Sequence, residues 1–458
     1  MQPMTVTEIA SAVKGVWWNP SEQVPVVSAV STDSRRIVPG SLFLPWVGEK
    51  FDGHLFIDAA LDAGAAGCLC AKLPQNIRED KFYIKVADTR LALRDLASAY
   101  RDRFEIPFVQ ITGSVGKTTT KDFIAAVLSA RYKTLKSQGN HNNEFGLPVT
   151  VFELDPSYQA GVFEMGMDAR GDISRLTAVV KPDIGVITNV GVSHLERLGT
   201  RENILAAKLE ITEGMADGSP LILCGDNDLL STVEIPRLRV LRYGIEAPEL
   251  DARAEEIVTG EGETRFVIVW KGGRYPARIP AMGRHNAMNA LAGFLVGIEA
   301  GMTPEEAAEA LSGYAISGMR QRVRLWNGIK VVEDCYNAAP DSMNAALDTL
   351  SGMECEGRKI CVFADMRELG SASDESHRAI GQHAARVADK LLVYGPQSHL
   401  YVEGANAAGL SDAREYPDRP ALTQAVREAV RPGDIVWFKG SLLMNLEEVL
   451  RAVFPDAE

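Results

Sequence analysis

Hydrophobic residues along the chain fall into short apolar runs that alternate with stretches of helical spacing. The run at 108–111 is followed by a glycine-containing turn and then, over 119–131, by apolar residues spaced as on one face of a helix. The runs at 161–163 and 184–187 are continuous, which is typical of strands buried on both faces of a parallel sheet. The pattern therefore predicts an α/β protein with a central doubly wound, mostly parallel sheet.

We expect three domains, with boundaries near residues 105 and 315. Residues 1–105 mix short strands and helices and predict a small α/β domain. Residues 106–315 contain the central sheet, and an alternating pattern on both sides of the turn at 271–273 predicts an antiparallel pair at its edge. Strand and helix patterns alternate again in 316–458, which predicts a C-terminal α/β domain.

Composition and charge narrow the classes of function. Hydrophobic residues make up 46% and charged residues 24% of the 458 residues, as in folded globular chains. The net charge of −13 gives no general positive field for nucleic acid. We find no signal peptide and no apolar run of the ~18 residues that a membrane-spanning helix needs. The six cysteines show no C-x-x-C pair, so we expect free thiols in a reducing cytoplasm.

The strongest motif directly follows the predicted strand 108–111 and opens the next helix. It consists of Gly113, Ser114, Val115, Gly116, Lys117, Thr118 and Thr119. In a phosphate-binding loop of this kind, backbone N–H groups and the helix N-terminus attract phosphate, Lys117 reaches the β- and γ-phosphates, and Thr118 ligates Mg²⁺. Ile111 replaces the first glycine of the full motif, so the loop is a shortened variant. The strand-to-helix context favours nucleotide binding over an ordinary turn that happens to carry a lysine.

Other polar residues follow predicted strands of the central sheet. Glu164 ends one strand, and His194 comes shortly after the strand that ends at Asn189. Ligands of open α/β sheets lie beyond the carboxyl ends of the strands, so Glu164 and His194 are placed to meet a nucleotide-bound Mg²⁺. A hydrogen-bonded structural histidine is the more ordinary alternative. Lys208 lies on a predicted helix over 201–215, where position alone favours a solvated lysine paired with a nearby glutamate.

Two further polar segments have open interpretations. The turn-prone run 139–144, which includes Asn142, could bind phosphate or substrate, or could be a simple loop. His285 opens a predicted helix on which Asn286 and Asn289 share one face. Their carboxamides could bind an adenine edge or cap the helix.

Together these motifs resemble the Mur ligases, ATP-dependent amide-forming enzymes of peptidoglycan assembly. The resemblance covers essentially the whole chain and rests on segments 112–120, 140–146, 164–166, 188–190 with His194, 283–286 and Asp334. Within the family, the dipeptide-adding member is the most similar, through segments 31–35, 39–43, 140–148, 334–343 and 365–370.

The resemblance implies the three-domain Mur ligase architecture. Residues 1–105 would bind the UDP-muramoyl peptide, 106–315 would form the ATP-binding P-loop domain, and 316–458 would form a Rossmann-like acceptor domain. It implies a cytoplasmic enzyme of peptidoglycan precursor synthesis that joins D-alanyl-D-alanine to UDP-N-acetylmuramoyl-tripeptide through an acyl phosphate, using ATP and Mg²⁺. We expect a monomer without a nucleic-acid partner.

The resemblance also assigns roles to single residues. Lys117 and Thr118 would hold the ATP phosphates and Mg²⁺, and Glu164 and His194 would be Mg²⁺ ligands. Lys208 matches a lysine that such ligases carbamylate, whose new carboxylate supports a second Mg²⁺. The remaining implied contacts are His285 and Asn286 with adenosine, Arg320 with a phosphate, Asp334 with the ribose, Ser34 and Arg35 with the UDP end, and Asn142 and Asn337 with substrate.

Two positions depart from the family pattern, both in the acceptor domain. Ala339 stands where a second asparagine is usual, and Leu442 where an arginine is usual. Three alternatives stay open: another Mur-type ligase that adds a single amino acid, a folylpolyglutamate or cyanophycin-type ligase, and a non-enzymatic nucleotide switch. The folylpolyglutamate and cyanophycin types do not share the 31–35 region, and a switch would need no acceptor domain.

Overall fold

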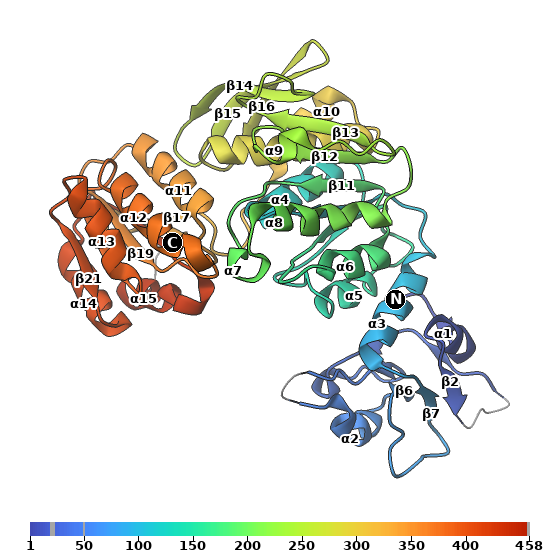
Figure 1. Ribbon diagram of the computed structural model, residues 1–458. Helices are drawn as coiled ribbons and strands as arrows, with labels where there is room; N and C mark the ends of the chain where they lie inside the picture. Colours follow the sequence, from blue (N-terminus) through green and yellow to red (C-terminus); the bar gives the residue numbers. More distant parts are fainter. Residues whose placement is uncertain (19–22, 49–50, 456–458) are drawn as a thin grey trace.

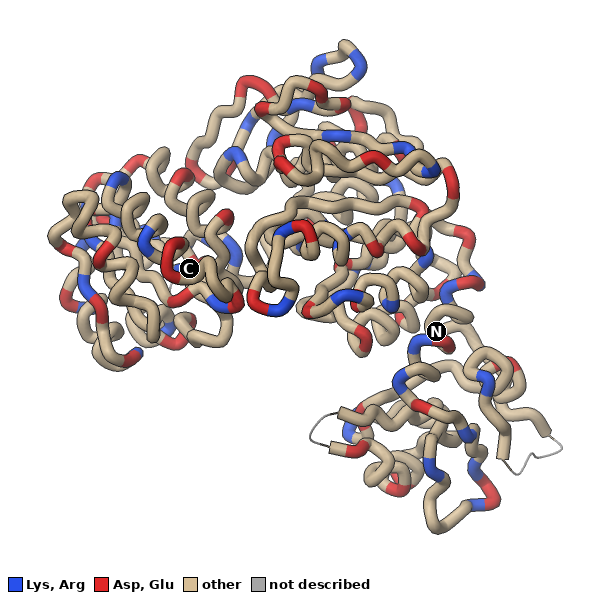
Figure 2. The backbone as a smooth tube through the Cα atoms, in the orientation of Figure 1, with Lys and Arg blue, Asp and Glu red and all other residues tan. Residues whose placement is uncertain are grey.

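The strands of the described residues form four sheets, of which three large ones follow one another along the chain and a short two-stranded one lies within the first section. The computed structural model describes residues 1–18, 23–48 and 51–455. Figure 1 shows three lobes, the first in blue, the central one in green to yellow, and the third in orange to red. Basic and acidic residues are interspersed over all three lobes (Figure 2). No helix of the described residues is both long and apolar enough to cross a membrane.

The first lobe contains a five-stranded sheet in the order β2-β7-β6-β5-β4 and a short antiparallel pair, β1 and β3. The strands are β1 Met4–Thr5, β2 Val16–Trp18, β3 Val26–Val27, β4 Val30–Ser31, β5 Leu42–Phe43, β6 Gly67–Cys70 and β7 Phe82–Lys85. The helices are α1 Val6–Ala12, α2 Ile57–Asp62 and α3 Thr89–Arg101. Asp88 precedes α3 and accepts hydrogen bonds from the first backbone N–H groups of this helix, as expected of an N-cap residue.

Helix α3 joins the first lobe to the central lobe. Its Tyr100 hydroxyl donates to the Leu154 carbonyl at 2.6 Å, and Arg101 Nε donates to the Val180 carbonyl at 2.5 Å. One continuous cluster of buried apolar residues includes this helix and extends into both lobes, while a smaller separate cluster lies within the first lobe. The boundary expected near residue 105 therefore lies between two sheets that share a hydrophobic core.

The central lobe is built on a nine-stranded sheet in the order β16-β15-β14-β13-β12-β11-β8-β10-β9. The strands are β8 Phe108–Thr112, β9 Thr134–Lys136, β10 Ala160–Glu164, β11 Ile184–Ile187, β12 Pro220–Cys224, β13 Arg239–Gly244, β14 Ala252–Thr259, β15 Thr264–Trp270 and β16 Gly273–Ile279. The sheet is parallel from β9 to β14 and antiparallel at its β14-β15-β16 edge. Lys271 and Gly272 both have positive φ in the β15–β16 turn, which confirms the predicted hairpin.

Helices cover both faces of the central sheet (Figure 1). They are α4 Lys117–Ser129, α5 Gly146–Val151, α6 Asp172–Val180, α7 Leu195–Leu198, α8 Arg201–Leu209, α9 Arg284–Glu299 and α10 Pro304–Ala310. The chain leaves β8 in one direction through α4 and returns past it through α6, so right-handed crossovers place these two helices on opposite faces. Helix α9 packs against α4 on one face, and α8 contacts α6 on the other. This arrangement is the predicted doubly wound sheet.

The third lobe has a six-stranded sheet in the order β17-β18-β22-β19-β20-β21, parallel except for the edge strand β17. The strands are β17 Arg322–Trp326, β18 Ile329–Asp334, β19 Lys359–Ala364, β20 Lys390–Tyr394, β21 Ala413–Tyr416 and β22 Ile435–Lys439. The helices are α11 Pro340–Gly352, α12 Ser373–Ala384, α13 Ser398–Ala407, α14 Arg419–Ala429 and α15 Leu446–Val453. Separate apolar clusters lie on the two faces of the sheet, as in a Rossmann-like layer structure.

Candidate active site

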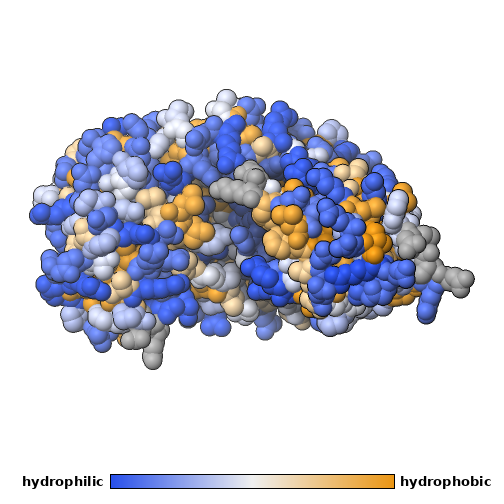
Figure 3. All heavy atoms as spheres, turned by 90° about the horizontal axis from the view of Figure 1, so that it is seen from below, coloured by the Kyte–Doolittle hydropathy of each residue, from blue (hydrophilic) through white to orange (hydrophobic). Residues whose placement is uncertain are grey.

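All three lobes contribute to one large cavity at the carboxyl ends of the central strands. Its volume is about 1410 Å³, above the ~300–1,000 Å³ typical of sites for one small molecule. The central lobe provides the loop 114–119, and the third lobe provides residues from the ends of β18 and β22. Trp46 and Phe51 of the first lobe add apolar walls, and exposed apolar side chains gather on that lobe in Figure 3. The cavity has room for more than one substrate.

The loop after β8 is shaped by two glycines and anchored to the end of β11. Gly116 has a φ of 82°, and a Cβ on Gly113 would meet the Thr188 hydroxyl, so neither position accepts a side chain without strain. The backbone N–H of Val115 donates to Asn189 Oδ1 at 2.8 Å. Lys117 Nζ donates to the Gly113 carbonyl at 2.8 Å, which holds the ammonium over the loop. The loop thus has the geometry of a phosphate-binding loop.

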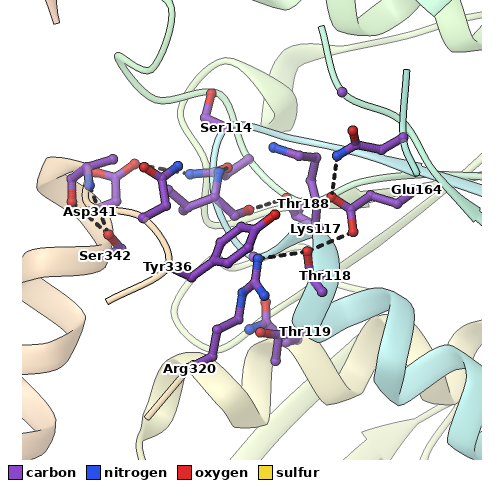
Figure 4. A pocket seen from close by; sticks show the side chains of 18 of the residues that line it. Ser114, Lys117, Thr118, Thr119, Glu164, Thr188, Arg320, Tyr336, Asp341 and Ser342 are labelled. Carbon is purple, nitrogen blue, oxygen red and sulfur yellow. Dashed lines mark hydrogen bonds between the residues drawn. The ribbon is translucent and has the colours of Figure 1, made fainter. Parts of the chain in front are cut away.

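Thr118 and Glu164 form the centre of a polar network that joins two lobes (Figure 4). The Thr118 hydroxyl donates to Glu164 Oε2 at 2.7 Å, and Asn142 Nδ2 donates to Glu164 Oε1 at 3.0 Å. Arg320, which precedes the third lobe's first strand, donates from Nη2 to Thr118 Oγ1 at 3.0 Å. Its guanidinium lies 3.9 Å from the ring centroid of Tyr336, a cation–π contact that holds it there.

Three buried basic side chains lie close together beside this network. Burial lowers the pKa of Lys117, with Glu164 opposing the shift. Burial and then the nearby Lys117 charge lower the pKa of Lys208 well below its ordinary value. Burial, then Lys117 and Lys208, lower the pKa of His194 to about 4. These shifts show that positive charge at this site lacks compensating negative charge, which a polyanionic ligand such as a nucleoside triphosphate would supply.

The first turn of α9 lies against the linker to the third lobe. Asn286 Nδ2 donates to the Met282 carbonyl at 2.8 Å and to Gln321 Oε1 at 3.1 Å. Asn289 Nδ2 donates to Asn286 Oδ1 at 3.4 Å. Gly283 is the N-cap residue, so the capping role considered for the two carboxamides is not observed. Both side chains line the cavity.

A buried ion pair lies on the third-lobe side of the cavity. Lys439 Nζ donates to Asp334 Oδ2 at 2.7 Å, at the carboxyl ends of the neighbouring strands β22 and β18. Burial raises the pKa of Asp334, with Lys439 opposing the shift. Lys439 Nζ also donates to the Asn337 carbonyl at 3.2 Å and so fixes the turn that follows β18.

Sequence profiles of Mur ligases match most of the chain. The family's catalytic domain matches residues 26–101, the Mur ligase middle domain matches 111–297, and the Mur ligase, glutamate ligase domain matches 319–442. The UDP-N-acetylmuramoyl-tripeptide--D-alanyl-D-alanine ligase of Bacillus subtilis is 38% identical over 450 residues, covering 98% of this chain and 97% of that protein. The chain belongs to the Mur ligase family.

Two solved structures extend the similarity to the arrangement of the lobes. MurF from Acinetobacter baumannii superposes with a TM-score of 0.91 at 26% identity, covering 99% of both chains. MurF ligase from Thermotoga maritima in complex with ADP gives a TM-score of 0.82 at 27% identity, covering 93% of this chain and 96% of that one. The similarity includes the first lobe, so the folylpolyglutamate and cyanophycin alternatives are not favoured.

Most of the residues predicted for a Mur ligase site meet at the cavity. The lining residues among them are Ser114, Gly116, Lys117, Thr118, Thr119, Asn142, Glu164, His194, His285, Asn286, Arg320, Asp334 and Asn337. Ser34 and Arg35 lie elsewhere, in the short helix η1 Ser34–Arg36, where Arg35 pairs with Asp33 and its side chain is 86% exposed. Ala339 lines the cavity, but Leu442 does not.

The expectation of a solvated Lys208 is wrong. Helix α8 ends at Leu209 and continues as a 3₁₀ turn, and Lys208 is only 1% exposed. The described residues give it no hydrogen bond or ion pair, so the predicted surface glutamate partner is not observed. The spacing of charges on this helix does not reveal that its Lys208 face packs inward.

Several residues at the site escaped the sequence interpretation. Asn189 Nδ2 donates to Asp341 Oδ2 of the third lobe at 3.1 Å, so the residue that anchors the phosphate loop also contacts the opposite lobe. Trp46 packs edge-on against Phe145 with ring centroids 5.0 Å apart, which joins the first lobe to the loop after Asn142. Asp341 lies within a segment that resembles the family, whereas no pattern points to the single aromatic residue Trp46.

The donors present fit Mg²⁺. The described residues contain no cluster of three or more His, Cys, Asp or Glu side chains that would hold a metal alone. Mg²⁺ usually takes one or two protein carboxylates and fills its other positions with phosphate oxygens and water, so the pair of Thr118 and Glu164 is sufficient on the protein side. The Thr118 hydroxyl and Glu164 Oε2 lie 2.7 Å apart, so one ion could contact both oxygens.

Proposed function

We propose that this Mur ligase joins D-alanyl-D-alanine to UDP-N-acetylmuramoyl-tripeptide, with conversion of ATP to ADP and phosphate. The observation that carries the proposal is the single cavity in which the phosphate loop meets residues of the other two lobes. The name of the B. subtilis relative, similar over 98% of this chain, supports the choice of substrates.

We assign one substrate to each section of the chain. Residues 1–105 would bind the UDP-muramoyl peptide, with Ser34 and Arg35 toward the UDP end, and residues 106–315 would bind ATP. Residues 316–458 would bind the dipeptide, with Asn337 at the acceptor side. The size of the cavity supports this division, because the tripeptide carboxylate, the γ-phosphate and the acceptor amine must meet in one place.

The first step activates the peptide carboxylate. A carboxylate is a poor electrophile, so one of its oxygens attacks the γ-phosphorus of ATP, the bond to the β-phosphate oxygen breaks, and an acyl phosphate and ADP form. Lys117 stands over the phosphate loop and would neutralise charge on the transferring group. Arg320, now 3.0 Å from the Thr118 hydroxyl, would do the same from the third-lobe side.

The second step forms the amide. The neutral amine of the dipeptide attacks the acyl carbon, phosphate leaves, and the nitrogen loses a proton. The acyl phosphate must be shielded from water, which the third lobe would do by covering the phosphate loop; the hydrogen bond from Asn189 to Asp341 supports this role. Bound Mg²⁺, held by Thr118, Glu164, His194 and a carbamylated Lys208, would supply further neutralisation of phosphate charge.

Phosphate release measured with all combinations of substrates tests the proposal. We expect release to require UDP-N-acetylmuramoyl-tripeptide, ATP and D-alanyl-D-alanine together, with a new amide product in mass spectrometry. Single D-alanine lacks the second residue and its carboxylate, so the dipeptide should be preferred by ~100-fold or more. Preference for a single amino acid on a shorter muramoyl peptide would refute the choice of acceptor and indicate another Mur-type ligase. ATP turnover independent of any acceptor would refute the ligase itself.

A further inference from the structure

His194 of the central lobe and Glu368 of the third lobe face each other in rare backbone conformations. Both are non-glycine residues with positive φ, 64° for His194 and 65° for Glu368. Residues in this region are uncommon and persist where the surrounding structure fixes them, often at functional sites. Glu368 Oε2 lies 2.9 Å from His194 Nδ1. The strained backbone on each side thus aims the two side chains at one another.

The surroundings of His194 are held by contacts with the third lobe. Helix α7 begins directly after His194 and packs against the short helix η6 Gly370–Ala372. Gly370 leaves no room for a side chain there, since a Cβ would lie 2.9 Å from the Cα of Glu196. Val192, just before His194, packs against the buried cluster of the third lobe. The position of His194 therefore depends on the third lobe being docked.

Glu368 is better placed than the other acidic neighbour of the ring. Asp168 Oδ1 is 3.8 Å from His194 Nδ1, and the carboxylate of Asp168 already pairs with Arg197 at 3.2 Å. His194 Nδ1 is buried and makes no hydrogen bond, although Glu368 is within hydrogen-bond distance. A buried ring nitrogen without a partner is costly, and alignment with the Glu368 carboxylate would satisfy it.

We propose that Glu368 is a positioning residue that orients His194 through Nδ1, so that the third lobe completes the metal site of the central lobe. This inference rests on the proposed function only in taking His194 as a metal ligand. With Nδ1–H donating to Glu368, the ring presents Nε2 to the cavity, which is the arrangement that carboxylates impose on metal-binding histidines. Docking of the third lobe then prepares the metal site at the moment when the reactants are enclosed.

Mn²⁺ binding to the full-length protein with ADP tests this role without turnover. Free Mn²⁺ is measured by electron paramagnetic resonance for the wild type and for Glu368→Ala, Glu368→Gln and His194→Gln. Loss of an outer-shell carboxylate typically lowers metal affinity about 10- to 100-fold, so we expect Glu368→Ala to weaken Mn²⁺ binding about 10-fold. Glu368→Gln keeps an oxygen acceptor and should retain most of the affinity. Glu375→Ala, an exposed carboxylate on α12 of the same lobe, is the matched control.

A double variant separates positioning of His194 from general electrostatics. If Glu368 acts through the imidazole, Glu368→Ala combined with His194→Gln should bind Mn²⁺ no more weakly than His194→Gln alone. Gly370→Ala should reproduce the loss with the carboxylate intact, because it pushes η6 from α7. Wild-type Mn²⁺ affinity in Glu368→Ala, or full additivity in the double variant, would overturn the inference. Either result is independent of which acceptor the ligase uses, so failure here is distinct from failure of the proposed function.

Discussion

Lys208 was expected on the surface and is buried in the structure, which changes the chemistry expected of its amine. It is 1% exposed, has no partner among the described residues, and its pKa is lowered well below the ordinary value by burial. Burial therefore disfavours the charged form of the Lys208 amine, and the neutral amine is the form that attacks CO₂ to give a carbamate with release of one proton. We predict that Lys208 is carbamylated in the active enzyme and that Lys208→Met is inactive but folded.

Lys208→Met should change stability and activity in opposite directions. A buried polar group without a hydrogen bond costs about 1–3 kcal/mol, so in CO₂-free buffer Lys208→Met should raise the free energy of unfolding by about that amount. Because burial lowers the native pKa of Lys208, the unfolded chain binds a proton that the native state does not between that lowered pKa and ~10.4, so this lysine lowers stability as the pH falls through that range. The catalytic rate should fall by ~100-fold or more, because the carboxylate that would support a second Mg²⁺ beside the phosphates is lost.

The assay compares phosphate release with thermal unfolding in buffers with and without bicarbonate. Bicarbonate should increase the rate of the wild type and leave Lys208→Met unchanged, and short carboxylic acids should partly restore the variant. A carbamate carbon should be observed by NMR after addition of ¹³C-bicarbonate. Lys72→Met, which alters an exposed lysine of the first lobe, is the control. A fully active Lys208→Met, or a wild type indifferent to CO₂ with no carbamate signal, would refute the reasoning.

Three further predictions concern the phosphate loop, the nucleoside side and the contact between lobes. Lys117→Ala should lower the ligation rate ~100-fold or more with an unchanged circular dichroism spectrum, because it removes one phosphate contact; near-wild-type turnover would contradict this site. Burial lowers the pKa of His285 to about 4, so between pH 6.5 and 4 the unfolded state binds a proton that the native state lacks, and stability falls as the pH falls. His285→Asn should therefore lose less stability from pH 7 to pH 5 in urea unfolding than the wild type, by about 2 kcal/mol, and equal losses would contradict the cause given. Gly191→Ala would place a Cβ 2.5 Å from Asp341 Oδ2, so steady-state kinetics should show a lower kcat, by up to ~100-fold, with ADP binding unaffected. Wild-type kinetics for that variant would show that the contact does not position the third lobe.

The features predicted best from the sequence are those set by residues close together in the chain. The loop around Lys117 and the carboxylate of Glu164 were found because the loop follows one strand of a parallel sheet and Glu164 ends another, and such ends meet at one edge. The β15–β16 hairpin was found for a similar reason, since its turn residues follow from backbone preference alone. The Asp88 cap of α3 is equally local.

Features set by contacts between distant segments were not predictable in the same way. Helix α12, Ser373–Ala384, packs against α13, and the spacing of its own apolar residues does not identify this partner. The bond between Asn189 and Asp341 joins residues 152 positions apart, and neither side chain carries a signal for the other. Depth of burial is likewise a property of the assembled lobes.

The contacts that dock the third lobe fall on the groups that would bind the ligands. Arg320 donates to the Thr118 hydroxyl, Asp341 accepts from the Asn189 carboxamide that anchors the phosphate loop, and Glu368 faces His194. A metal at Thr118 competes with the guanidinium for the same hydroxyl oxygen, whereas phosphates attract that guanidinium more strongly than the hydroxyl does. The free energy of nucleotide binding therefore differs between the docked and the undocked third lobe. This difference is the condition for nucleotide binding to shift docking, and for docking to shift nucleotide binding. The charges of Lys117 and Arg320 would thus meet at the phosphates only when the third lobe is docked. Formation of the hydrolysable acyl phosphate would then be confined to the enclosed site.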